Sequence, residues 1–116
     1  MPSKEWQAIA DFQQKFYPTW LSDDKPRLLF SNALAGEVGE VCGVVTHLDG
    51  GGTNLKKYTE RMLLHQCVDT YIQLVLLLEK SGFTYADFEK EFWKVLNEEL
   101  PRRLEEKQKL EAASEK

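Results

Sequence analysis

The 116-residue sequence has little basic charge, few cysteines and few histidines. Nineteen acidic residues outnumber fifteen basic ones, so the chain lacks the basic excess of a general nucleic-acid-binding protein. The two cysteines, Cys42 and Cys67, have no disulfide-framework spacing, and we expect buried thiols in a reducing compartment. Neither histidine completes the Glu-x-x-His motif that di-iron carboxylate bundles use, and this excludes that class.

Long hydrophobic runs are also missing. The longest uninterrupted apolar run covers residues 74–78, which is far shorter than a membrane span, and residues 1–6 lack the apolar core of a signal peptide. We therefore expect a cytoplasmic protein with no membrane partner. The glycine-rich stretch at residues 50–52 lacks the spacing and the Lys-Ser/Thr pair of a phosphate-binding P-loop.

The apolar residues that are present recur at helical spacing, and no strand-like alternation is longer than a few residues. The spacing predicts a helix after Ser3 that ends at Pro18, and helices over residues 28–48 and 55–81. A fourth helix is predicted to follow Thr84, with Pro101 bending or restarting the chain. These segments predict an all-α bundle of four to five helices over residues 1–105, followed by a charged tail over 106–116.

Two polar pairs interrupt the apolar pattern of neighbouring helices. Glu37 and Glu40 lie one turn apart in the second predicted helix, and Gln66 and Asp69 have the same spacing in the third. On packed antiparallel helices these four side chains can converge, and oxygen ligands of this kind suit Mg²⁺. The alternative is that both glutamates face water, as most charged residues do, and that Gln66 and Asp69 belong to a polar edge facing water or to an interhelical hydrogen-bond network. Gly36, Gly39 and Gly43 predict a close approach of another helix or a ligand beside the glutamates. His65 is expected to point away from the group.

Residues 32–41, NALAGEVGEV, and residues 68–77, VDTYIQLVLL, resemble the two motifs of the MazG-like all-α nucleoside triphosphate pyrophosphohydrolases. Their signature is a Glu-x-x-Glu pair on one helix and a Glu-x-x-Asp pair on the next. The Gly-Glu-Val-Gly-Glu form is similar to the branch that acts on deoxynucleotides such as dCTP. The resemblance covers roughly residues 5 to 105.

The resemblance implies hydrolysis of a (deoxy)nucleoside triphosphate to the monophosphate and pyrophosphate. Mg²⁺, with Mn²⁺ as a substitute, would be held by Glu37, Glu40, Gln66 and Asp69, and one of the two glutamates would activate water. The family has glutamate where this chain has Gln66, which predicts weakened metal binding. A natural variant, a decayed binding protein and an engineered substitution all fit this departure.

The resemblance also implies residues that contact the substrate and an oligomeric assembly. Lys94 and Asn97 resemble the family's Lys and Asn near the C-terminus, although a solvated helix edge explains them equally well. Lys57 could reach the phosphates, and Trp20 is one of several aromatic residues that could stack on the base or simply form core. Homodimers or homotetramers are expected, and the apolar residues 67–78 fit a helix that a partner subunit buries. The alternative function is a non-catalytic helical nucleotide-binding or scaffold protein.

Overall fold

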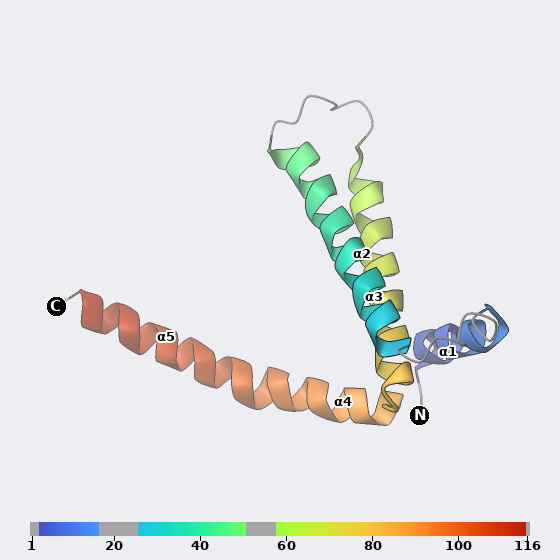
Figure 1. Cartoon of the computed structure of the whole chain (residues 1–116). Helices are drawn as coiled ribbons and strands as arrows, with labels where there is room; N and C mark the ends of the chain where they lie inside the picture. Colours follow the sequence, from blue (N-terminus) through green and yellow to red (C-terminus); the bar gives the residue numbers. More distant parts are fainter. Residues whose placement is uncertain (1–2, 17–25, 51–57, 116) are drawn as a thin grey trace. The chain divides into compact units, whose positions relative to one another are not determined.

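A computed structural model describes residues 3–16, 26–50 and 58–115 of the chain. All regular structure in these ranges is helical, which confirms the predicted all-α class (Figure 1). The contacts divide the chain into two units, residues 3–82 and residues 83–116 with 1–2, and each is described by itself. The predicted boundary between residues 105 and 106 lies inside a continuous helix and stays a prediction.

The first unit consists of α1 (Lys4–Phe16), α2 (Pro26–Asp49) and α3 (Glu60–Lys80). The helices α2 and α3 form an antiparallel hairpin, and α1 packs against α3 (Figure 1). Ser3 caps α1 as predicted, because its hydroxyl accepts a hydrogen bond from the Trp6 backbone N–H at 3.1 Å. The predicted stop at Gly82 is also confirmed, since this glycine has φ +88° just beyond the end of α3.

The start of α3 differs from the prediction. The helix begins at Glu60 rather than near residue 55, because Thr59 has an extended backbone and its hydroxyl accepts a hydrogen bond from the Met62 N–H at 3.2 Å. This side chain satisfies a first-turn N–H that has no partner inside the helix. Thr59 therefore fixes the start of α3, although the apolar pattern before it is also helix-like.

Large apolar side chains from all three helices form a small core. The buried members are Trp6, Ile9, Phe30, Val44, Val75 and Leu76. The indole N–H of Trp6 donates a hydrogen bond to a carboxylate oxygen of Glu79, which gives this buried ring a polar partner on α3. Phe30 and Val44 hold α2 in the core, and this packing sets the position of the glutamates that lie between them.

Truncation of Phe30 tests the packing of α2 in this core. Phe30 is 2% exposed, so Phe30→Ala should lower the free energy of unfolding by about 3–5 kcal/mol, measured by urea unfolding. Leu28→Ala is the control, because Leu28 is 55% exposed on the same helix and its truncation should change stability by about 0.5 kcal/mol or less. Equal losses in the two variants would contradict this placement of Phe30.

Contacts within one chain do not meet two expectations about packing in this unit, and both stay predictions for an assembly or a bound ligand. The segment 67–78 is not buried on several sides: only Val75 and Leu76 are buried, while Val68 is 49% exposed. A Cβ atom added at Gly36, Gly39 or Gly43 would meet nothing within 4 Å, so no described segment approaches these glycines closely. Both observations have one cause, which is that a two-helix hairpin covers only one face of each helix.

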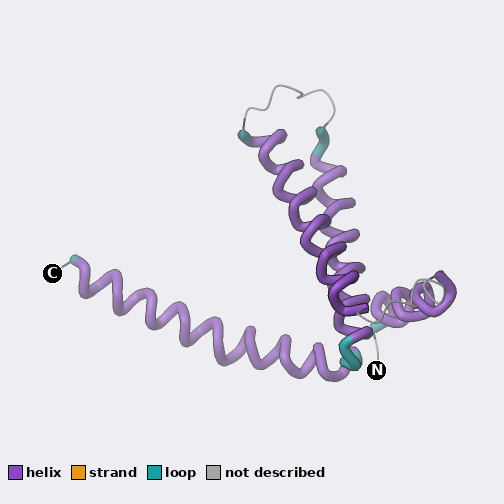
Figure 2. Tube along the Cα trace, viewed as in Figure 1, coloured by secondary structure: helices purple, strands orange, loops and turns teal. Residues whose placement is uncertain are grey.

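The second unit is one continuous helix in three parts: α4 (Tyr85–Lys94), the π-helical turn η2 (Val95–Glu99) and α5 (Leu100–Ser114) (Figure 2). Thr84 and Asp87 form the predicted capping box. Pro101 neither bends sharply nor restarts the chain. The wider π turn precedes it, and proline, which has no N–H to donate, lies at the start of α5 where the helix continues.

By length and composition alone, residues Arg27–Asp49 of α2 could also cross a membrane. Core helices of soluble proteins share this property, and Glu37 and Glu40 lie near the middle of the segment. The expectation of no membrane partner stays a prediction.

Candidate functional site

The four polar residues at the predicted spacing come together where α2 and α3 pack. With its amide nitrogen turned toward α2, as the surrounding acceptors require, Gln66 donates hydrogen bonds to both glutamates. The distances are 2.8 Å to Glu40 Oε2 and 3.3 Å to Glu37 Oε2. Gln66 thus takes part in the interhelical hydrogen-bond network that the alternative allowed, and Glu40 is exposed to water.

The electrostatics of Glu37 place Asp69 in the same group. The pKa of Glu37 is raised above its ordinary value, first because packing removes water from the carboxylate, and then because Glu40 and Asp69 lie nearby. A hydrogen bond with Glu40 raises the pKa further, and the charge of His65 partly opposes the shift. Three carboxylates thus lie close enough to influence one another, with the Gln66 amide relieving part of their repulsion.

His65 belongs to this group, although the sequence analysis set it aside. Its Nε2 lies 3.4 Å from Asp69 Oδ2, and its side chain is largely exposed. The signal was present in the sequence, because His65 and Asp69 are four residues apart and share a helix face.

Arg61 is a second residue that the sequence analysis missed. A cavity of about 410 Å³ lies along the first turns of α3 and is lined by Thr59, Arg61, Met62, His65 and Gln66. Arg61 and His65 are again four residues apart, so the guanidinium of Arg61 and the imidazole of His65 follow one edge of α3 from the carboxylate group toward its N-terminus. Anionic groups are favoured at a helix N-terminus, and a guanidinium binds phosphate oxygens well.

The donor chemistry of the group fits a hard divalent cation, because Glu37, Glu40 and Asp69 offer carboxylate oxygens and Gln66 offers an amide oxygen. The side chains, however, are not positioned to bind a metal ion without rearrangement. Among the described ranges, no group of three or more His, Cys, Asp or Glu residues is placed so that it could hold a metal ion. The hydrogen bonds from Gln66 occupy carboxylate oxygens that metal binding would need, so the amide must turn or move when a cation enters.

The remaining predicted residues lie in the second unit or outside the described residues. Lys94 ends α4 and Asn97 lies in η2, and both are exposed in the second unit. Their spacing of three residues places them near one another on that helix, and a role in substrate binding stays a prediction. Trp20 and Lys57 lie outside the described residues.

Comparisons with protein-family models, with curated proteins and with solved structures found no match to this chain. The resemblance to the MazG-like pyrophosphohydrolases therefore depends on the two motifs and on the convergence of their side chains.

Proposed function

We propose that this chain is a Mg²⁺-dependent nucleoside triphosphate pyrophosphohydrolase of the MazG-like class, with activity that Gln66 reduces. The observation that carries the proposal is the convergence of Glu37, Glu40, Gln66 and Asp69 from two helices. The edge of Arg61 and His65 beside them suits a ligand that carries both metal and phosphate.

Each residue has a separate task in this proposal. Glu37, Glu40, Gln66 and Asp69 would hold Mg²⁺ or Mn²⁺, and the bound cation supplies positive charge that neutralises phosphate oxygens and promotes attack by water. One of the two glutamates, Glu37 or Glu40, would accept a proton from the attacking water. His65 orients the Asp69 carboxylate, and Arg61 binds phosphate oxygens in the cavity at the start of α3.

One observation favours the second candidate, a non-catalytic nucleotide-binding or scaffold protein. The Gln66 amide already satisfies both glutamates through hydrogen bonds, so this group is stable without a cation. A chain that no longer binds metal would keep Arg61 and His65 beside the cavity, and so could bind a nucleotide without hydrolysing it.

The apolar surface of the hairpin supports the proposed homodimer or homotetramer. Large side chains of both helices are exposed, namely Val38, Val45, Leu64, Val68 and Tyr71. Exposed apolar side chains in this number on two neighbouring helices suit an interface with a second copy. The open surface at Gly36, Gly39 and Gly43 would let a helix of a second copy approach α2 closely.

Pyrophosphate release tests the enzyme proposal directly. The chain is incubated with a panel of ribonucleoside and deoxyribonucleoside triphosphates, with Mg²⁺, with Mn²⁺ and with excess chelator. The proposal expects slow, cation-dependent release of pyrophosphate and the nucleoside monophosphate from at least one substrate. Cation-dependent binding without release would support the second candidate, and neither binding nor release would overturn both.

Arg61 gives a more local test of the phosphate contact. Arg61→Gln should weaken binding of a non-hydrolysed triphosphate analogue in Mg²⁺ by about tenfold, because a charge-assisted hydrogen bond contributes roughly 1.5–3 kcal/mol. Titration calorimetry measures the change, and Arg27→Gln, an exposed position on α2 outside the cavity, is the matched control. Equal affinities for Arg61→Gln and the unmodified chain would remove Arg61 from the site.

A further inference from the structure

The second unit carries an apolar stripe that crosses from α4 to α5. Its members are four residues apart: Phe88, Phe92, Leu96, Leu100 and Leu104. In a regular α-helix each step of four residues drifts by about 40°, so this stripe would wind about 160° around the helix. A face that winds in this way cannot pack along its length against one straight partner helix.

The π turn corrects this drift. The Leu100 N–H donates its hydrogen bond to the Val95 carbonyl, five residues back, so η2 takes up one extra residue. The extra residue rotates the positions of all later residues by about 100° around the helix axis, against the drift. Leu100 and Leu104 therefore face the same side of the helix as Phe88 and Phe92. A groove of about 280 Å³ is consistent with this alignment, because residues on both sides of the π turn line it: Phe88, Phe92, Leu96 and Leu100.

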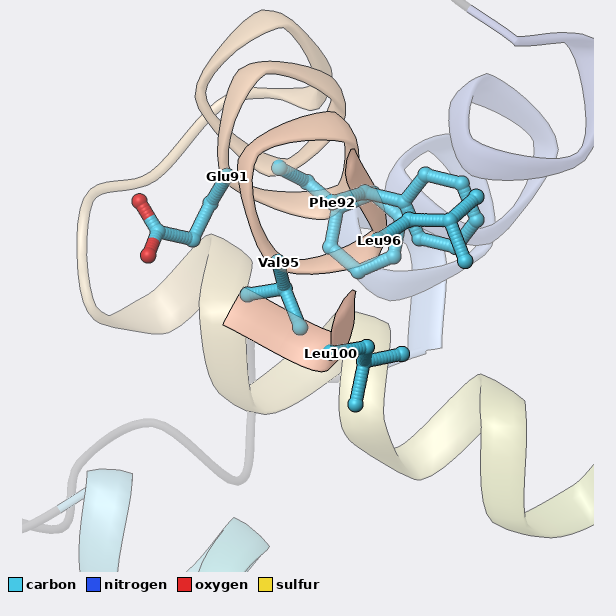
Figure 3. Close-up of a pocket in the computed structure, with 6 residues that line it drawn as sticks. Glu91, Phe92, Val95, Leu96 and Leu100 are labelled. Atoms are coloured by element: carbon cyan, nitrogen blue, oxygen red, sulfur yellow. The ribbon is translucent and has the colours of Figure 1, made fainter. Parts of the chain in front are cut away.

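Figure 3 shows how the groove is built. The side chains of Phe92 and Leu96 lie together, with Leu100 following them, while the carboxylate of Glu91 points away from Phe92 and Leu96. Phe88 and Phe92 stack with ring centroids 6.2 Å apart. No described residue from 83 to 115 is buried, and the side chains of Phe92, Leu96, Leu100 and Leu104 are 41–56% exposed. A helix with this much exposed apolar surface depends on a partner for its stability.

The charges along the helix identify the partner. For antiparallel pairing centred near Leu96 and Asn97, residues 100–109 of one copy face residues 85–94 of the other. Residues 85–94 contain three acidic and two basic side chains, whereas residues 100–109 contain four basic and two acidic ones. Two copies that pair antiparallel place the acidic half of each against the basic half of the other, and parallel pairing would oppose like charges. Glu91 and Arg103 lie on the same edge of the stripe, so antiparallel pairing brings Glu91 of one copy near Arg103 of the second.

We propose that the α4–η2–α5 stripe is a homotypic interface, on which the same helix of a second copy docks antiparallel with its centre near Leu96 and Asn97. The pairing is two-fold symmetric, and one surface serves both copies. It places the aromatic half of each stripe on the aliphatic half of the other. The interface does not depend on the proposed enzymatic function.

Cross-linking of the full chain tests both the partner and the direction. Cys42 and Cys67, which are exposed and not buried as predicted, are first replaced by serine. Glu91→Cys and Arg103→Cys are then made in separate chains, and a short flexible bismaleimide is added to each alone and to an equilibrated mixture. Antiparallel pairing predicts a cross-linked dimer chiefly in the mixture. Equal cross-linking of each variant with itself, or no cross-linking in the mixture, would overturn the proposal.

A pair of leucine substitutions separates this stripe from the rest of the surface. Leu100→Glu should abolish the mixed cross-link and lower the particle mass by half in light scattering, because it puts a charge in the groove. Leu110→Glu is the matched control, since Leu110 is 72% exposed on α5 and does not line the groove, and it should leave both readouts unchanged. Circular dichroism checks that both variants keep their helices. An unchanged cross-link in helical Leu100→Glu would overturn the proposal.

Discussion

Replacement of Gln66 by glutamate is expected to raise Mg²⁺-dependent pyrophosphate release by about ten- to a hundredfold. The change removes two hydrogen bonds, from the Gln66 amide to Glu40 and Glu37, that hold the carboxylates together without metal. It also supplies a fourth carboxylate where the present chain offers a neutral amide oxygen, and a charged ligand binds a hard cation more strongly. Both effects favour the metal-loaded state.

The same variant should respond to metal in its stability. Without a divalent cation, Gln66→Glu adds a charge beside Glu37, Glu40 and Asp69, and we expect a lower melting temperature than that of the unmodified chain. Added Mg²⁺ should reverse the difference, because a ligand that binds only the folded state stabilises it. Thermal unfolding with and without chelator measures both arms.

A matched control separates the site from a general effect of charge. Gln14→Glu makes the same change at an exposed position of α1 and should alter neither the rate nor the response to Mg²⁺. If Gln66→Glu is no faster than the unmodified chain on every substrate, the position is not a metal ligand. The second candidate function would then be favoured.

Glu37→Gln is expected to have opposite effects on activity and on stability. Loss of a proposed metal ligand, and of one of the two candidate bases, should reduce pyrophosphate release by about 10²-fold or more, best measured in the more active Gln66→Glu background. Stability without metal should rise at neutral pH. The pKa of Glu37 is raised by loss of water and by Glu40 and Asp69, so its ionised form is disfavoured in the folded chain.

The pH dependence follows from the direction of this shift. Between the ordinary pKa and the raised pKa the folded chain holds more protons on Glu37 than the unfolded chain does, so the free energy of unfolding falls as pH rises through this window. Glu37→Gln removes that fall. The gain in stability should therefore be absent at low pH and complete above the raised pKa of Glu37.

Glu5 provides a control with the opposite sign. Hydrogen bonds from its backbone N–H and from the Ser3 hydroxyl lower the pKa of Glu5, so its ionised form stabilises the folded chain. Glu5→Gln should therefore lower the melting temperature at neutral pH, where Glu37→Gln raises it. A loss of stability in Glu37→Gln at neutral pH, with chelator present, would contradict the assignment of Glu37 to a crowded acidic group.

Local features of this chain could be predicted from its sequence because they depend on residues within one or two turns. Ser3, the Thr84–Asp87 box and Gly82 mark helix ends through hydrogen bonds and backbone angles that neighbouring residues determine. The one-turn spacing of Glu37 with Glu40 and of Gln66 with Asp69 is of the same kind. The contact between His65 and Asp69 could also have been predicted, because residues four apart share a helix face.

The sequence by itself thus determined the helices, their caps and the residues able to share a face. Only the tertiary structure decided that the Gln66 amide bridges Glu37 and Glu40, and that packing removes water from Glu37. It also decided that Val68 is exposed and that the π turn realigns the stripe of α4 and α5. The physical reason is that burial and hydrogen bonding between helices depend on which faces meet, and helical periodicity leaves that open.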